Sequence, residues 1–260
     1  MTDSILHAEA FDGVLQLQLR APEVRNALSA EMKRALHEQA RRFVEDDGLR
    51  CLLITGCDAV FCAGGDLRTM QSDRSTVGVR RRMALTHASV RLLAECEKPI
   101  VTAVNGAAVG AGLSLALMGD VVVAAEDAYF MAGFANVGVL PDMGVLYHLP
   151  RTVGRVQAND LLLSNRRVNA QEALGLGLVS RVLPADGFLA QAQALARSIA
   201  AGPAVSFGLA RALMAGAYKD SFGEFLLKES LAQAVVFGTD DFAEGVSAYG
   251  DKRKPRFTGR

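Results

Sequence analysis

The sequence predicts an α/β fold in which strands and helices alternate and a purely helical segment follows. Apolar runs typical of strands occur between residues 14 and 183, and segments with helical spacing separate them. Between residues 99 and 118, a strand, a glycine-rich turn and a helix follow one another. From about residue 186 onward, every segment is typical of helix.

The first strands and helices can be placed from their spacing. Val14–Leu19 alternates apolar and polar residues, which is typical of a half-buried strand. Ser29 is a suitable N-cap for a helix that carries apolar residues at helical spacing. Cys51–Thr55 is the next predicted strand and Gly56 ends it. Residues 71–79 are predicted to form a surface loop before a long helix that ends near residue 95.

The central stretch combines a buried strand, Pro99–Val104, with three closely spaced glycines, Gly106, Gly110 and Gly112. Glycine permits sharp turns and the close approach of another group. The apolar segment Leu113–Met118 that follows is compatible with a helix. A turn that opens a helix presents free backbone N–H groups, so this stretch favours binding of a negatively charged oxygen.

The rest of the chain contains two further predicted strands, a loop with one acid and a series of helices. The strands are Ala128–Met131 and Val179–Leu183, and Asp142 is the acid of the loop at residues 133–144. The predicted helical segments are residues 145–149, 153–164, 170–174, 186–200, 203–217, 220–237 and 239–250. The change to helix alone divides the chain into a core of residues 1–195 and a C-terminal region of residues 196–260.

Composition argues against several classes of partner. The chain has 260 residues, of which 50% are apolar, enough for a sizeable core. Lys and Arg number 28 and Asp and Glu also number 28, so no net charge attracts nucleic acid or a membrane surface. The basic residues of the first helix could suggest RNA binding, but acidic residues share that helix. These residues are Lys33, Arg34, Arg41 and Arg42, beside Glu31, Glu38 and Glu45.

Metal binding, secretion and membrane insertion are likewise not expected. The four cysteines lack CxxC spacing and a histidine partner in metal register. The N-terminus has no basic region followed by an apolar one, so a cytoplasmic location is predicted. Residues 99–119 carry no charge, as a membrane helix would, but Asn105 and the glycines interrupt the run.

Four motifs occur in order along the chain and resemble the crotonase (enoyl-CoA hydratase/isomerase) superfamily. They are Phe61–Leu67, Lys98–Gly106, Val137–Pro141 and Ala173–Ser180. The resemblance extends from Pro22 to the basic tail. It implies a spiral of β-β-α units and a helical C-terminal region that forms trimers, often paired into hexamers. It also implies acyl-CoA thioesters as substrates, with no separate cofactor.

The same resemblance assigns roles to individual residues. The backbone N–H groups of Gly65 and Ala111 would form an oxyanion hole for the thioester oxygen. Coenzyme A would be held by two loops and by the tail, where the tail of a neighbouring subunit sometimes contributes. The residues at these positions are Val24, Arg25, Ala63, Gly65, Asp66, Leu67, Lys254 and Phe257.

The chain departs from the family pattern at two positions. Family hydratases activate water with two glutamates, and these positions hold Ser114 and Phe134 here. Asp142 matches the single acid of some family isomerases, most closely in the phenylacetate-pathway ring isomerase branch. Ser114, Phe134 and Leu140 would line the pocket around it, and a carboxylate with apolar walls has a raised pKa.

One carboxylate is sufficient to move a double bond from C3 to C2 of an acyl group. Asp142 would take a proton from C2, and the same acid would return a proton at C4. Three alternatives remain: an enoyl-CoA hydratase, a non-catalytic CoA-binding protein, and a structural role in which Asp142 only caps a helix. His87 shares one helix face with Met83, Val90 and Ala94 and is interpreted as a face residue rather than a catalyst.

Overall fold

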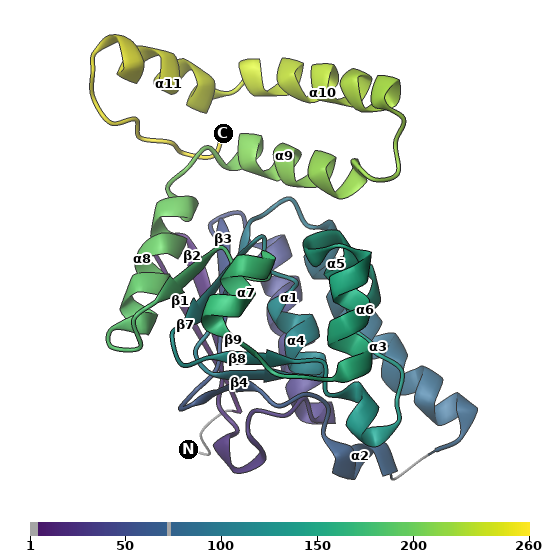
Figure 1. Ribbon diagram of the computed structural model, residues 1–260. Helices are drawn as coiled ribbons and strands as arrows, with labels where there is room; N and C mark the ends of the chain where they lie inside the picture. Colours follow the sequence, from purple (N-terminus) through teal and green to yellow (C-terminus); the bar gives the residue numbers. More distant parts are fainter. Residues whose placement is uncertain (1–4, 72–73) are drawn as a thin grey trace.

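Two β-sheets organise the structure, a computed structural model that describes residues 5–71 and 74–260 (Figure 1). The six-stranded sheet has the order β1-β2-β3-β5-β7-β10, and the four-stranded sheet has the order β4-β6-β8-β9. The larger sheet contains β1 (Leu6–Phe11), β2 (Val14–Leu19), β3 (Cys51–Thr55), β5 (Ile100–Val104), β7 (Val121–Ala125) and β10 (Arg181–Leu183). The smaller sheet contains β4 (Val60–Cys62), β6 (Ala107–Val109), β8 (Tyr129–Met131) and β9 (Val168–Asn169).

The two sheets are built by a repeated unit. In each repeat, one strand enters the large sheet and the next strand enters the small sheet, and one or more helices follow. The repeats are β3 with β4, β5 with β6, and β7 with β8. Within each sheet, the strand of one repeat pairs in parallel with the strand of the next repeat. The arrangement confirms the α/β prediction and the spiral of β-β-α units that the resemblance implies.

The helices cover both faces of the large sheet. Helix α8 (Phe188–Ala200) contacts β2, β3 and β5, and α1 (Ala30–Glu45) packs along α3 (Thr76–Glu95). Ser29 caps α1 as predicted, because its hydroxyl accepts a hydrogen bond from the Met32 N–H. The other helices of the core are η1 (Pro22–Val24), α2 (Leu67–Gln71), α4 (Ala111–Ala116), η2 (Phe134–Val137), α5 (Val145–Val153), α6 (Arg155–Ser164) and α7 (Ala170–Leu176).

The loop predicted at residues 71–79 is largely helix. Helix α3 already begins at Thr76, and the Ser75 hydroxyl accepts a hydrogen bond from the Gly78 N–H as its N-cap. The polar composition of this segment indicated a loop, although one of its polar residues, Ser75, caps the start of a helix. Residues 72–73 lie outside the described residues.

Three C-terminal helices form a separate layer beside the core (Figure 1). These are α9 (Ala204–Gly216), α10 (Phe222–Phe237) and α11 (Asp240–Gly250). The division predicted near residue 195 falls within α8, which packs on the sheet, so the chain leaves the core after that helix. Among the described helices, no single one is long and apolar enough to cross a membrane; α8 and α9 pass this test only as a pair bent by 100°.

Arg211 anchors this layer to the core. From α9, its guanidinium donates hydrogen bonds to the backbone oxygens of Leu93, Ala94 and Cys96 at the end of α3. The same group forms an ion pair with Asp120, 2.8 Å away, just before β7. The carbonyls at the end of α3 therefore have a fixed cationic partner, which the helix dipole favours.

Candidate active site

Two glycine-containing loops lie against each other at the candidate site. Gly64 has a φ of +102°, and a Cβ at this position would lie 2.9 Å from the Val109 oxygen and 3.4 Å from the Ala111 nitrogen. The Gly64 oxygen accepts a hydrogen bond of 2.7 Å from the Leu28 N–H. Only a residue without a side chain can lie this close to the backbone of Val109, which explains the presence of Gly64 in the Phe61–Leu67 motif.

The backbone donors of Gly65 and Ala111 lie on these two loops. In the part of the chain that the structure describes, neither N–H donates a hydrogen bond to another residue. Ala111 is the first residue of α4, where backbone N–H groups have no partner within the helix. Both groups are therefore free to donate to an oxygen atom of a ligand.

Asn26 supports the loop that contains Val24 and Arg25. Its side chain is fully buried, accepts from the Ala21 N–H at 2.9 Å and donates to the Val60 oxygen at 2.7 Å. The Arg25 oxygen accepts from the Ala63 N–H at 3.0 Å, so this loop is held beside the Gly64 turn. The supporting role of Asn26 was not predicted from the sequence, although asparagine is one of the few residues that tolerate its φ of +56°.

Asp66 caps the turn that leads into α2. Its carboxylate accepts hydrogen bonds from the Arg68 backbone N–H at 3.0 Å and from Arg68 Nε at 3.1 Å, and the residue is 7% exposed. The neighbouring Leu67 side chain is exposed, on the outer side of the same turn.

The loop that carries Asp142 is fixed through its backbone. The Asp142 oxygen accepts hydrogen bonds from the Ser114 hydroxyl at 2.9 Å and from the Val145 N–H at 3.2 Å. Met143 and Gly144 both have positive φ values, +54° and +83°. Gly144 is the N-cap of α5 and no side chain caps that helix, so the alternative in which Asp142 only caps a helix is wrong.

The Asp142 carboxylate lacks a complete set of hydrogen-bond partners. Its Oδ1 atom is buried and has no partner among the described residues. Burial raises the pKa of this carboxyl, and electrostatic interactions with Lys33 and His87 oppose that effect in part. A raised pKa is typical of a carboxylate that exchanges protons with a ligand.

The residues predicted to line the pocket have different environments. Phe134 is 7% exposed, whereas Leu140 is 78% exposed. In a single chain, Leu140 therefore shields the Asp142 carboxylate from solvent only slightly. Asn165 supports the Phe134 segment: its side-chain oxygen accepts from the Gly133 N–H at 2.6 Å, and its amide donates to the Asn136 side chain at 2.7 Å. No local sequence pattern predicts this support.

Two basic residues that act on the pKa of Asp142 were given other interpretations from the sequence. Lys33 on α1 was grouped with the basic residues that could suggest RNA binding, and His87 on α3 was interpreted as a face residue rather than a catalyst. Both act on the pKa of Asp142 in the structure, and the His87 side chain is exposed. Helical spacing places a residue on a face, but only the packing of α1 and α3 shows which face meets Asp142.

The C-terminal tail lies away from this cluster in the same chain. The Phe257 oxygen accepts a hydrogen bond from Arg50, which directly precedes β3, and the Phe257 ring lies against Gly245 of α11. Lys254 lies in the same tail segment, along a surface groove beside α11. Gly65, in contrast, follows the carboxyl ends of β3 and β4. Contact of Lys254 and Phe257 with the coenzyme A of a neighbouring subunit therefore stays a prediction.

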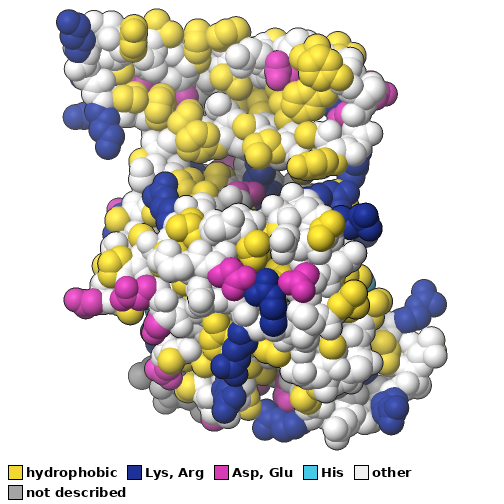
Figure 2. All heavy atoms as spheres, viewed as in Figure 1, with side chains coloured by type: hydrophobic (Ala, Val, Ile, Leu, Met, Phe, Trp, Pro, Cys, Tyr) yellow, Lys and Arg dark blue, Asp and Glu magenta, His cyan; other side chains and the backbone are white. Residues whose placement is uncertain are grey.

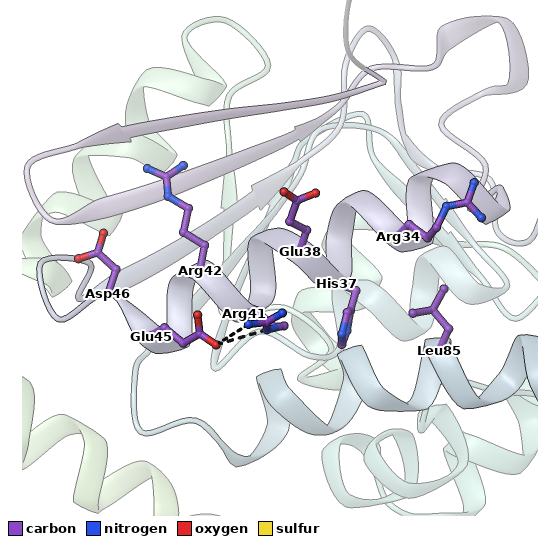
Figure 3. A pocket seen from close by; sticks show the side chains of 8 residues that line it. All are labelled: Arg34, His37, Glu38, Arg41, Arg42, Glu45, Asp46 and Leu85. Atoms are coloured by element: carbon purple, nitrogen blue, oxygen red, sulfur yellow. Dashed lines mark hydrogen bonds and ion pairs between the residues drawn. The ribbon is translucent and has the colours of Figure 1, made fainter.

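A separate groove of about 530 Å³ lies between the outer surfaces of α1 and α3 (Figure 3). Its arginines and acids are balanced, and Arg41 pairs with Glu45 at 3.0 Å. Its lining residues are Arg34, His37, Glu38, Arg41, Arg42, Glu45, Asp46 and Leu85. We assign no ligand to this balanced surface.

Comparison with known proteins identifies the family. The family model described as enoyl-CoA hydratase/isomerase matches residues 9–260. The chain belongs to the enoyl-CoA hydratase/isomerase family. It is 37% identical to a 1,2-epoxyphenylacetyl-CoA isomerase of Escherichia coli over 95% of this chain and 96% of that protein. It is 34% identical to a probable enoyl-CoA hydratase of Rhodobacter capsulatus over the full length of both.

Solved structures of the family agree with the fold. An enoyl-CoA hydratase from Bacillus anthracis superimposes with a TM-score of 0.93 at 28% identity, covering 98% of this chain and all of that one. A putative enoyl-CoA hydratase from Streptomyces coelicolor also has a TM-score of 0.93, at 31% identity, covering 100% of this chain and 96% of that one. These comparisons confirm the crotonase superfamily.

Replacing Ser114 with alanine is expected to lower kcat several-fold with little change in KM. The substitution removes the hydrogen bond that holds the Asp142 backbone, worth about 1 kcal/mol, without touching the carboxylate. Steady-state kinetics with an acyl-CoA substrate would measure the change. Ser230→Ala is a matched control, because its hydroxyl also donates to a backbone oxygen, that of Leu227, on exposed α10. Equal kinetics for both variants would contradict the positioning role of Ser114.

Proposed function

We propose that this family member shifts the double bond of a 3-enoyl-CoA, or of a related ring-containing acyl-CoA, to the position conjugated with the thioester. The N–H groups of Gly65 and Ala111 would donate to the thioester oxygen and stabilise the enolate. A single donor of this kind contributes about 3 kcal/mol to transition-state stabilisation. Asp142 would remove a proton from C2 and return one at C4.

The buried Asp142 carboxylate, with an unpartnered Oδ1, carries this proposal. A carboxylate that must both accept and return a proton works best with a pKa closer to the working pH, and burial raises its pKa in that direction. Ser114 and Phe134 stand where family hydratases hold two glutamates, so neither can activate water as an acid or base.

Two other functions remain as alternatives. A hydratase is favoured by the names of several relatives, among them the probable enoyl-CoA hydratase of Rhodobacter capsulatus. Hydration needs a group that activates water in addition to one that protonates the α-carbon. A CoA-binding protein without turnover would keep the two backbone donors but would show no reaction that depends on Asp142.

We also propose that the protein assembles into trimers, alone or in pairs, through its C-terminal helices. The C-terminal layer exposes many large apolar side chains (Figure 2). They include Met214, Tyr218, Phe222, Leu227, Leu231, Val235 and Tyr249, each more than half exposed. Such a surface favours association with copies of the same chain. Light scattering coupled to size-exclusion chromatography would give the mass of the assembly.

The purified protein should be given a 3-enoyl-CoA and a 2-enoyl-CoA in separate reactions, with products identified by chromatography and mass spectrometry. Conversion of the 3-enoyl-CoA to the 2-enoyl-CoA, without a gain of water, supports the proposal. Efficient hydration of the 2-enoyl-CoA would favour the hydratase. If neither linear substrate nor a ring-containing acyl-CoA reacts while coenzyme A binds, the isomerase proposal fails.

The pH profile of kcat/KM is expected to fall on the acid side, at a pH above the ordinary range of an exposed aspartate. Asp142 must be ionised to remove the first proton, and burial raises its pKa, so activity is lost as the pH falls through that raised value. Rates measured across the acid range with the 3-enoyl-CoA would show this limb. An acid limb at the ordinary aspartate value would contradict the role of burial.

A further inference from the structure

Three turns of the candidate site pack together through glycines that all have a positive φ. Gly64, Gly110 and Gly133 have φ values of +102°, +58° and +74°. A Cβ on Gly110 would lie 3.9 Å from the Gly64 Cα atom, and a Cβ on Gly133 would lie 3.1 Å from the Gly110 nitrogen. Gly110 therefore lies in contact with both other turns, and its position depends on both.

The position of Gly110 determines the direction of the Ala111 N–H group. Gly110 is the N-cap of α4, and Ala111 is the first residue of that helix. The Gly110 N–H donates to the Met131 oxygen at 3.1 Å, which joins this turn to the end of β8, two residues before Gly133. A backbone donor stabilises a developing negative charge best when its direction is fixed beforehand. A movement of the Gly133 turn would thus be transmitted to the Ala111 donor.

Asn165 fixes the position of the Gly133 turn. Its side-chain oxygen accepts a hydrogen bond from the Gly133 N–H at 2.6 Å, and its amide nitrogen donates to the Asn136 side-chain oxygen at 2.7 Å. Gly133 is the N-cap of η2 and Asn136 is the third residue of that helix, so the two bonds hold η2 at two points. The backbone N–H of Gly133 can only donate, and an acceptor at position 165 is therefore required for this bond.

The backbone conformation of Asn165 does not by itself explain the presence of a side chain. Asn165 ends α6 with φ +53° and ψ +29°, the left-handed conformation in which glycine is the usual residue. Asparagine tolerates this conformation and, unlike glycine, adds a hydrogen-bonding group. The side chain at position 165 is therefore explained by its bonds to Gly133 and Asn136.

We infer that Asn165 is a positioning residue for the oxyanion site: through the Gly133 and Gly110 turns, its side chain fixes the direction of the Ala111 N–H group. In this role it acts through the backbone and takes no part in proton transfer. The inference rests on the proposed function only in that Ala111 donates to the thioester oxygen.

Infrared spectroscopy of a bound thioester tests this inference without turnover. A hydrogen bond to a carbonyl oxygen lowers the stretching frequency of that carbonyl. Isotope labelling of the thioester carbonyl of octanoyl-CoA, a saturated ligand with no double bond to move, separates its band from the amide bands of the protein. The spectra give the shift of this band on binding to the wild type and to each variant.

Two substitutions of Asn165 separate its hydrogen bonds from its backbone conformation. Asn165→Gly keeps the left-handed conformation and removes both bonds. Asn165→Asp keeps an acceptor for the Gly133 N–H, and the Asn136 amide group can rotate to donate to it. Asn169→Ala is the matched control, because it removes a bond of the same kind, from the Glu172 N–H to the Asn169 side-chain oxygen at 2.9 Å, at the start of α7.

In the wild type, we expect the carbonyl band of bound octanoyl-CoA to lie at a lower frequency than that of the free ligand. Asn165→Gly should lose part of this shift, and its kcat with a 3-enoyl-CoA should fall by about tenfold while the Kd of octanoyl-CoA changes less. Asn165→Asp and Asn169→Ala should keep the wild-type shift. A full shift in Asn165→Gly would overturn the inference, and so would an Asn165→Asp protein that is as impaired as Asn165→Gly.

The infrared result separates this inference from the proposed reaction. A shift that depends on Asn165 would support the inference even if a 3-enoyl-CoA is not converted. A wild-type shift that Asn165→Gly retains would leave the two backbone donors in place and remove Asn165 from their positioning. A wild-type band that does not shift on binding would overturn both the oxyanion site and the role of Asn165. Thermal unfolding would verify that each variant is folded at the temperature of the spectra.

Discussion

Replacing Asp142 with asparagine is expected to lower kcat by about a hundredfold to ten-thousandfold and, at the same time, to raise thermal stability. The amide has nearly the shape of the carboxyl but cannot accept a proton from C2, and general acid–base groups contribute about this factor. Because the Asp142 backbone oxygen, rather than its side chain, is bonded to Ser114 and Val145, the loop should keep its position.

The gain in stability follows from the direction of the pKa shift. Burial raises the pKa of Asp142 in the folded state, so the folded protein holds this proton more tightly than the unfolded chain does. The stability contributed by the protonated group is present at low pH and is lost as the pH rises through the folded pKa. At neutral pH the ionised side chain therefore destabilises the fold, and a neutral amide relieves that cost.

Kinetics and scanning calorimetry at neutral pH would measure both effects. Asp127→Asn is the matched control, since it makes the same chemical change at an exposed carboxylate and should alter neither quantity. Near-wild-type turnover in Asp142→Asn would show that another group moves the proton. A lower melting temperature would show that the carboxylate stabilises the folded state through contacts that the amide lacks.

Replacing Gly112 with alanine is expected to destabilise the fold by at least about 3 kcal/mol. A Cβ at this position would lie 2.1 Å from the Cys62 oxygen and 2.8 Å from its carbonyl carbon. Both atoms belong to the backbone of β4, so no side-chain rotation can relieve the overlap. Either α4 or β4 must move, and the movement displaces the Ala111 donor at the start of α4.

Urea unfolding would give the loss of stability for Gly112→Ala, and the isomerase assay would show the accompanying loss of activity. Gly175→Ala is the control: it lies in helix α7 with nothing within 4 Å of its Cβ. This variant should be as stable as the wild type or up to about 1 kcal/mol more stable, because alanine favours helix over glycine. A stable, active Gly112→Ala protein would mean that α4 and β4 can separate without cost.

The strands and helices with strong periodicity were predictable from the sequence, whereas the short strands Val60–Cys62 and Ala107–Val109 were not. Cys51–Thr55 is a strand over the predicted residues, and Ile100–Val104 differs from its prediction by a single residue. Val60–Cys62 and Ala107–Val109 have three residues each, too few to show a period, and they lie beside glycines that read as turns. Their pairing with each other makes them strands, and that pairing is a tertiary contact.

The site was predictable where the chemistry belongs to one motif. Asp142 was identified because it is the single acid of a loop, and the glycine loops because their composition permits close approach. Lys33 and Asn26 were not identified, since their roles depend on which segments pack against them. Lys33 acts on the carboxylate of Asp142, more than one hundred residues later in the chain, and no local sequence pattern can indicate such a distant interaction.

The two donors proposed for the thioester oxygen are backbone groups, and this has an evolutionary consequence. No substitution except one to proline can delete a backbone N–H. The ability to stabilise an enolate therefore persists while side chains are substituted during evolution. The reaction that follows depends on a few positions around the acyl group, such as 114, 134 and 142. Relatives 34–37% identical over nearly their whole length can therefore carry names of different reactions on one inherited scaffold.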